Sequence, residues 1–127
     1  MIDVPPLQDL PDLSDPAARQ RLGPAALRAF YRMMQTWHIS DVDADLLLVG
    51  IPADGRQLSE EQMLRISYLL GIWKALRMLF SGPLAEGWIQ TENKGPLYNG
   101  ATPLQFIISG GLPALEQVRL RLDSMTW

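Results

Sequence analysis

The stretch SEEQMLRISYLLGIWKALRMLF, residues 59–80, decides the fold of this chain. Ser59 followed by Gln62 is a capping-box pattern, which predicts that a helix begins here. The apolar residues that follow cover more than one face of this helix: Leu69, Leu70, Ile72, Trp73, Leu76, Leu79 and Phe80. A helix that is apolar nearly all round is surrounded by other helices or by another subunit. We therefore predict a long central helix as the core, with a close helix approach at Gly71.

The segments on either side of this helix also predict helices. From Asp15 onward no stretch shows the alternation of apolar and polar residues that is typical of a strand. We expect helices at 16–23, from 24 to the buried residue Trp37, at 41–49 after the N-cap Ser40, at 83–89, at 103–109 and from 113 onward, with breaks at Gly50 and Gly110-Gly111. The helix from residue 24 should bury one stripe, made of Leu27, Phe30, Tyr31, Met34 and Trp37. The fold class is therefore predicted as all-α, in a single compact helical domain.

Composition limits the function. The chain has 127 residues, of which 47% are hydrophobic, and its net charge is −3, so it is expected to fold as one domain without a general attraction to phosphate. It has no cysteine and a single histidine, His38, which argues against thiolate metal sites, cysteine nucleophiles and a Ser-His-Asp triad. We see no phosphate-cradling glycine motif or paired-carboxylate signature. The sequence predicts a protein that is not an enzyme and uses no metal or cofactor.

The first fifteen residues differ from the rest of the chain. They hold four aspartates and three prolines but no basic residue, which predicts a flexible acidic leader at 1–15. This start lacks the basic and apolar parts of a signal peptide. The most apolar segment, 66–80, is interrupted by Lys74 and Arg77 and falls short of the roughly 20 apolar residues of a membrane span. We therefore expect a cytoplasmic protein without a membrane partner.

Residues 58–123 carry a set of short motifs. The long helix leads to a W-[LI]-x-x-x-N segment, then to a G-G-x-[ST]-P-L helix start, and last to a V-R-x-x-L-D helix. The matching positions are Trp88, Asn93, Gly100, Thr102, Pro103, Leu104, Val118, Arg119, Leu122 and Asp123. In this order and spacing the set resembles the toxin-binding domain of Xre/MbcA/ParS-type antitoxins. The resemblance implies an antitoxin of a type II toxin–antitoxin system, with 58–127 as its toxin-binding region.

The same resemblance implies the partner and the mechanism. The partner would be a cognate RES-domain toxin, which degrades NAD or transfers its ADP-ribose. The antitoxin would bind this toxin and block its NAD-binding cleft with its C-terminal region. Members of the family also usually carry an N-terminal helix-turn-helix that represses their own promoter, and residues 16–57 are expected to form a degenerate version of it.

DNA binding is not expected of the chain alone. Only eight residues, Ile51–Leu58, separate Gly50 from Ser59, so a turn leaves no room for a recognition helix. Residues 40–61 hold six acidic residues against one base, Arg56, which would repel phosphate. The alternative hypothesis is a DNA-binding autorepressor of its own operon. It would use four arginines of the N-terminal helices: Arg19, Arg21, Arg28 and Arg32.

The expected contacts follow from the C-terminal position of the toxin-binding region. The candidate toxin-binding residues are Tyr98, Arg119, Arg121, Leu122, Asp123, Met125, Thr126 and Trp127. Trp127 is expected to anchor the interface, since Trp is enriched at hot spots, with folding back onto its own core or fraying of the chain end as the alternatives. Leu97 and Tyr98 are expected to be exposed unless another part of the chain covers them. The alternative for Arg119 and Asp123 is an ordinary i,i+4 ion pair.

The central helix also suggests an association between copies of the chain. Its apolar surface exceeds what a protein of this size easily hides, which indicates a homodimer within a larger complex with the toxin. The candidate dimer interface is Tyr68, Ile72 and Trp73. Packing of these residues within one chain is the alternative.

Overall fold

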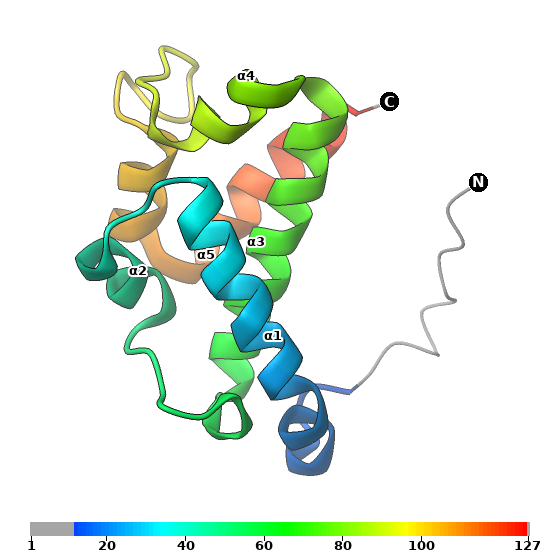
Figure 1. The fold of residues 1–127 in the computed structure, drawn as a ribbon. Helices are drawn as coiled ribbons and strands as arrows, with labels where there is room; N and C mark the ends of the chain where they lie inside the picture. Colours follow the sequence, from blue (N-terminus) through cyan, green and yellow to red (C-terminus); the bar gives the residue numbers. More distant parts are fainter. Residues whose placement is uncertain (1–11, 127) are drawn as a thin grey trace.

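The computed structural model describes residues 12–126, which form α-helices and short 3-10 turns with no strand in this part of the chain (Figure 1). The α-helices are α1 (Pro16–Thr36), α2 (Asp41–Leu48), α3 (Glu60–Leu79), α4 (Gly82–Gly87) and α5 (Pro103–Ser124), and the 3-10 turns are η2 (Gly55–Gln57) and η3 (Trp88–Gln90). The all-α prediction is thus confirmed. The predicted leader lies largely, and Trp127 entirely, outside the described residues.

Helix α3 is the centre of the protein, as residues 59–80 predict. It packs against both α1 and α5 (Figure 1), and Leu69 and Ile72 are fully buried between them. The expected capping box is present. The Gln62 backbone N–H donates to Ser59 Oγ at 3.1 Å, and the Ser59 N–H donates to Gln62 Oε1 at 2.9 Å. The local signal therefore sets where α3 begins.

Helix α1 corrects one prediction. It is a single helix from Pro16 to Thr36, not two helices divided at Gly23. Pro24 inside it removes one backbone hydrogen bond, but the fixed φ of proline is compatible with a helix. Gly23 allows a close approach, because a Cβ at this position would overlap the carbonyl oxygen of Gly55 in η2. The glycine thus serves a tertiary contact and does not end the helix.

The buried stripe of α1 is also shifted from its prediction. Leu27, Phe30, Met34 and Trp37 are buried as expected, but Tyr31 is 46% exposed and Met33 is buried in its place. At about 100° per residue, Tyr31 lies on the outer edge of the stripe, while Met33 lies on the opposite edge, toward the neighbouring helices. The spacing alone predicts that Tyr31 is buried. The positions of the neighbouring helices decide that the edge of the stripe with Met33 is covered and the edge with Tyr31 is not.

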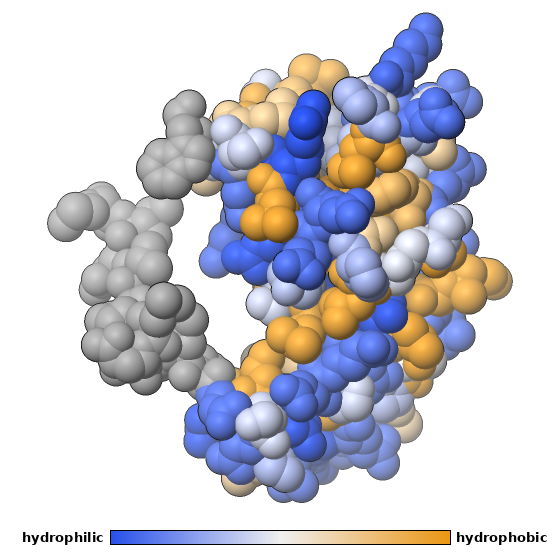
Figure 2. Space-filling model, turned by 180° about the vertical axis from the view of Figure 1, so that it is seen from behind, coloured by the Kyte–Doolittle hydropathy of each residue, from blue (hydrophilic) through white to orange (hydrophobic). Residues whose placement is uncertain are grey.

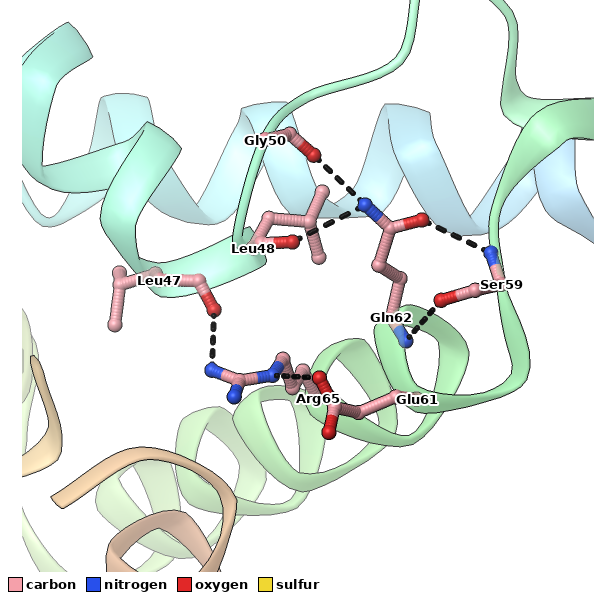
Figure 3. Close-up of polar contacts among 7 residues, drawn as sticks. All are labelled: Leu47, Leu48, Gly50, Ser59, Glu61, Gln62 and Arg65. Atoms are coloured by element: carbon pink, nitrogen blue, oxygen red, sulfur yellow. Dashed lines mark hydrogen bonds and ion pairs between the residues drawn. The ribbon is translucent and has the colours of Figure 1, made fainter.

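Helix α2 is held by two side chains of α3 (Figure 3). Gln62 Nε2 donates to the carbonyl oxygens of Leu48 and Gly50, at 3.1 and 2.7 Å, and Arg65 Nη1 donates to that of Leu47 at 3.1 Å. These carbonyls have no partner within the helix, as at any helix C-terminus. Arg65 is only 8% exposed and also pairs with Glu61 at 3.3 Å. The contacts fix the end of α2 to the core.

Helix α5 is bent where the sequence predicts a break. Gly111 has φ 67° and ψ −146°, a non-helical conformation that separates the two halves of the helix. The predicted start is confirmed by a second capping box, in which Thr102 and Gln105 exchange two hydrogen bonds of 3.0 Å. The bend lets the second half of α5 pack along α3, on the far side of the view in Figure 1.

Candidate functional site

The loop of residues 91–101 and the last turns of α5 enclose a depression of about 120 Å³. It is lined by Trp88, Asn93, Gly95, Pro96, Leu97, Tyr98, Arg121, Leu122 and Met125. A shallower hollow lies next to it and shares Pro96, Leu97 and Arg121, with Gln117 and Leu120 on its other side. We call these two hollows together the loop–α5 surface. Figure 2, which views the molecule from the α5 side, shows hydrophobic patches between hydrophilic residues on this face.

Asn93 holds the loop in shape. Its backbone N–H donates to the carbonyl oxygen of Ala101 at 3.0 Å, and its carbonyl oxygen accepts from the Gly100 N–H at 2.9 Å. Its side chain accepts a third hydrogen bond, from the Gly95 N–H at 2.9 Å. Gly100 has φ 89°, a conformation that favours glycine. The motif residues Asn93 and Gly100 therefore hold the two ends of the loop together, so that the residues between them project from its base.

Tyr98 does not have the predicted exposure, which is a correction. Only 6% of the residue is exposed, because its ring packs edge-on against Trp88 and Phe106, with centroids 5.8 and 5.6 Å away. Among the residues that the structure describes, none forms a hydrogen bond with its hydroxyl. Burial raises the pKa of Tyr98 to about 12, and the charge of Arg121 acts in the opposite direction. Tyr98 supports the loop and contributes little exposed surface to the depression that it lines.

We expect this raised pKa to make the protein sensitive to alkali. Between about pH 10 and 12 the unfolded chain loses the Tyr98 proton while the folded chain keeps it, so stability falls as the pH rises through this window. The variant Tyr98→Phe should lose less stability there and be at least as stable at pH 9, because it lacks the unpaired hydroxyl. Urea unfolding of both proteins at pH 9 and 11.5 measures the difference. An equal loss of stability in the wild type and in Tyr98→Phe would contradict the raised pKa of Tyr98.

The other predicted contact residues at the end of α5 differ in their exposure to solvent. Arg121 is exposed and Met125 is 51% exposed, so both are available to a partner on the loop–α5 surface. Leu122 is only 1% exposed and belongs to the core, so its prediction as a contact residue is wrong. Thr126 is half-buried and its hydroxyl donates to the carbonyl oxygen of Asp123 at 2.8 Å.

Arg119 and Asp123 lie on a different side of α5. Arg119 Nε is 3.6 Å from the Asp123 carboxylate, which is the i,i+4 ion pair named above as the alternative. The guanidinium also lies over the Tyr68 ring, 5.7 Å from its centroid. A Cβ on Gly71 would come within 2.5 Å of Arg119 Nε, so the space at this glycine is filled by the Arg119 side chain and not by the backbone of a neighbouring helix, as the predicted close helix approach required. This pair faces α3 and not the loop–α5 surface.

The candidate dimer interface is packed within the chain. Ile72 is fully buried, so a direct contact of Ile72 with a second subunit is excluded in this fold. The Trp73 ring lies 5.6 Å from that of Trp37, and Tyr68 is half-buried next to Arg119. Packing within one chain, the alternative named above, describes Ile72, while Tyr68 and Trp73 are half-buried.

The region expected to be a degenerate helix-turn-helix lacks a recognition helix. Between α2 and α3 the chain forms only the 3-10 turn η2, as the eight-residue spacing predicts. The one basic residue there, Arg56, pairs with Asp54 at 2.9 Å. Among residues 12–126 no cluster of His, Asp or Glu could hold a metal ion, and none of the described helices is both long and apolar enough to cross a membrane.

The chain is similar over most of its length to a protein from a bacterium. An uncharacterized protein of Sinorhizobium fredii, y4oB, is 32% identical over 121 residues, which covers 87% of this chain and 92% of that protein. No protein-family model matches the chain, and no solved structure matches it.

Proposed function

This chain belongs to the family of the uncharacterized protein y4oB of Sinorhizobium fredii, and we propose that it is the antitoxin of a type II toxin–antitoxin system. It binds a RES-domain toxin that degrades NAD or transfers its ADP-ribose, and it blocks the NAD-binding cleft sterically. It acts in the cytoplasm by binding, without a catalytic step or a cofactor. The basis of the proposal is the resemblance of residues 58–123 to the toxin-binding domain of Xre/MbcA/ParS-type antitoxins.

One observation carries the proposal. Two residues of the resembling motif, Trp88 and Asn93, line the same depression as Arg121 and Met125, which lie about thirty residues further along the chain. Beside them Leu120 is 61% exposed. Exposed Met and Arg side chains on a partly apolar surface are typical of protein interfaces, and arginine can bind a carboxylate through two hydrogen bonds. The loop–α5 surface therefore has the composition of a protein-binding site.

The test is inhibition of a purified cognate RES-domain toxin by this chain, measured as the rate of NAD consumption. Arg121→Glu should raise the concentration needed for half-inhibition at least about thirtyfold, as expected of an interface hot spot worth about 2 kcal/mol. A variant that ends at Ser124 should also inhibit less. It leaves Leu122 in place, because this residue is part of the core. Arg28→Glu, an equal change at an exposed arginine of α1, should inhibit like the wild type.

Three results would count against the proposal. The folded wild type could fail to bind the toxin, or bind it while NAD consumption continues unchanged. Either result would refute the antitoxin function. Equal inhibition by Arg121→Glu and Arg28→Glu would instead place the toxin contact outside the loop–α5 surface.

A further inference from the structure

Helix α2 exposes an apolar stripe on its outer side. Val42, Leu46 and Val49 are 72, 50 and 60% exposed, although Ala44, Leu47 and Leu48 of the same segment are buried in the core. Val42 and Leu46, at i and i+4, lie on one face of the helix, and Val49 follows directly after the last turn, in the C-cap position. Because α2 lies at an edge of the molecule (Figure 1), this face is open to solvent. We call these three residues the α2 stripe.

Val49 is held in a conformation that is costly for valine. Its φ of 55° and ψ of 54° lie in the left-handed region, which glycine and asparagine adopt far more easily than a β-branched residue. Its side chain is 60% exposed, so packing within the chain does not offset this strain. The left-handed φ has a local structural cause, the C-cap of α2, in which the Val49 N–H donates to the Leu46 carbonyl oxygen at 3.4 Å and the Gly50 N–H to that of Asp45 at 2.9 Å.

Acidic residues flank the stripe on both sides. From the helical angles, Asp41 and Asp45 lie along one edge of it and Asp43 along the other. Helix α2 has no basic residue to neutralise them. A surface with an apolar centre and acidic edges is complementary to a helix with an apolar face bordered by Lys or Arg, and it repels phosphate. A second copy that docked through the same stripe would place aspartates against aspartates.

The stripe is also pre-ordered. The carbonyl oxygens of Leu47, Leu48 and Gly50, directly beneath its C-terminal end, are bound by Arg65 and Gln62 of α3 (Figure 3). Ser40 caps the other end, since its Oγ accepts from the Asp43 N–H at 3.2 Å. A partner therefore does not have to order α2 when it binds, which removes part of the usual entropy cost.

We propose that the α2 stripe is a docking site for a basic amphipathic helix of another protein. The partner helix lies against Val42, Leu46 and Val49 with its apolar face, and its Lys or Arg residues pair with Asp41, Asp43 and Asp45. This interface is separate from the loop–α5 surface and does not depend on the toxin proposal. An eight-residue helix is about 12 Å long, which corresponds to two to three turns of the partner.

The probe for this proposal is a labelled helical peptide of Leu and Lys with one apolar face, titrated with the full chain in a fluorescence anisotropy assay. The wild type should bind it, more weakly at higher salt, and should not bind the same peptide with Glu in place of Lys. Val49→Asn should lower the affinity at least fivefold, because it removes apolar surface, while it raises the Tm by about 4 °C, because it relieves the strained φ.

Two further variants complete the test. Leu46→Gln should also lower the affinity at least fivefold, whereas Leu84→Gln, at a 69% exposed leucine of α4, should leave it unchanged. The proposal is overturned if the basic peptide does not bind, or if it binds the wild type, Val49→Asn and Leu46→Gln equally. It is also overturned if sedimentation shows a wild-type oligomer that Val49→Asn dissociates, because a second copy would then cover the stripe.

Discussion

Replacing Trp37 with alanine is expected to lower the free energy of unfolding by about 3–5 kcal/mol. Trp37 is 2% exposed, and its ring packs against Trp73 with a centroid distance of 5.6 Å. The smaller side chain would leave a cavity between α1 and α3 that rigid helices cannot close. Urea unfolding followed by far-UV circular dichroism measures the change.

Tyr31→Ala is the control for this prediction. Tyr31 lies on the same helix and was expected from its spacing to be buried, but it is 46% exposed. Its loss should therefore cost no more than about 1 kcal/mol. Similar losses in both variants would mean that α1 presents a different face to the core.

Gly23→Ala is expected to destabilise the protein by about 3 kcal/mol, although alanine forms helices better than glycine by about 1 kcal/mol. The new Cβ would overlap the backbone of Gly55, and neither backbone segment can move without disturbing the contact between α1 and η2. The sign of the effect is thus opposite to that of helix propensity. Thermal and urea unfolding of the variant measure it.

Gly87→Ala is the matched control, because a Cβ at Gly87 would meet nothing within 4 Å. The stability of this variant should stay within about 0.5 kcal/mol of the wild type. If Gly23→Ala were instead stabilising, the close contact with Gly55 would be refuted, and helix propensity alone would govern this position.

The candidate site was predictable only in part. The resemblance motif drew attention to Trp88, Asn93 and the last helix, and Arg121 and Met125 are indeed exposed there. The burial of Tyr98 and Leu122 was not predictable, because it depends on which side of the loop and of α5 faces the rest of the chain. The α2 stripe was missed as well. Its sequence, DVDADLLLV, shows apolar residues on two faces of a helix but not which of them the core covers.

The sequence by itself determined where α2, α3 and α5 begin. Ser40, Ser59 and Thr102 each form the cap predicted for them, because a cap hydrogen bond joins residues only two or three positions apart. Tertiary structure decided the rest. It alone decided that α1 continues through Gly23, that Arg65 and Gln62 hold the end of α2, and that Tyr98 is covered. These features depend on groups that are distant in the chain, and their positions are fixed only when the helices pack.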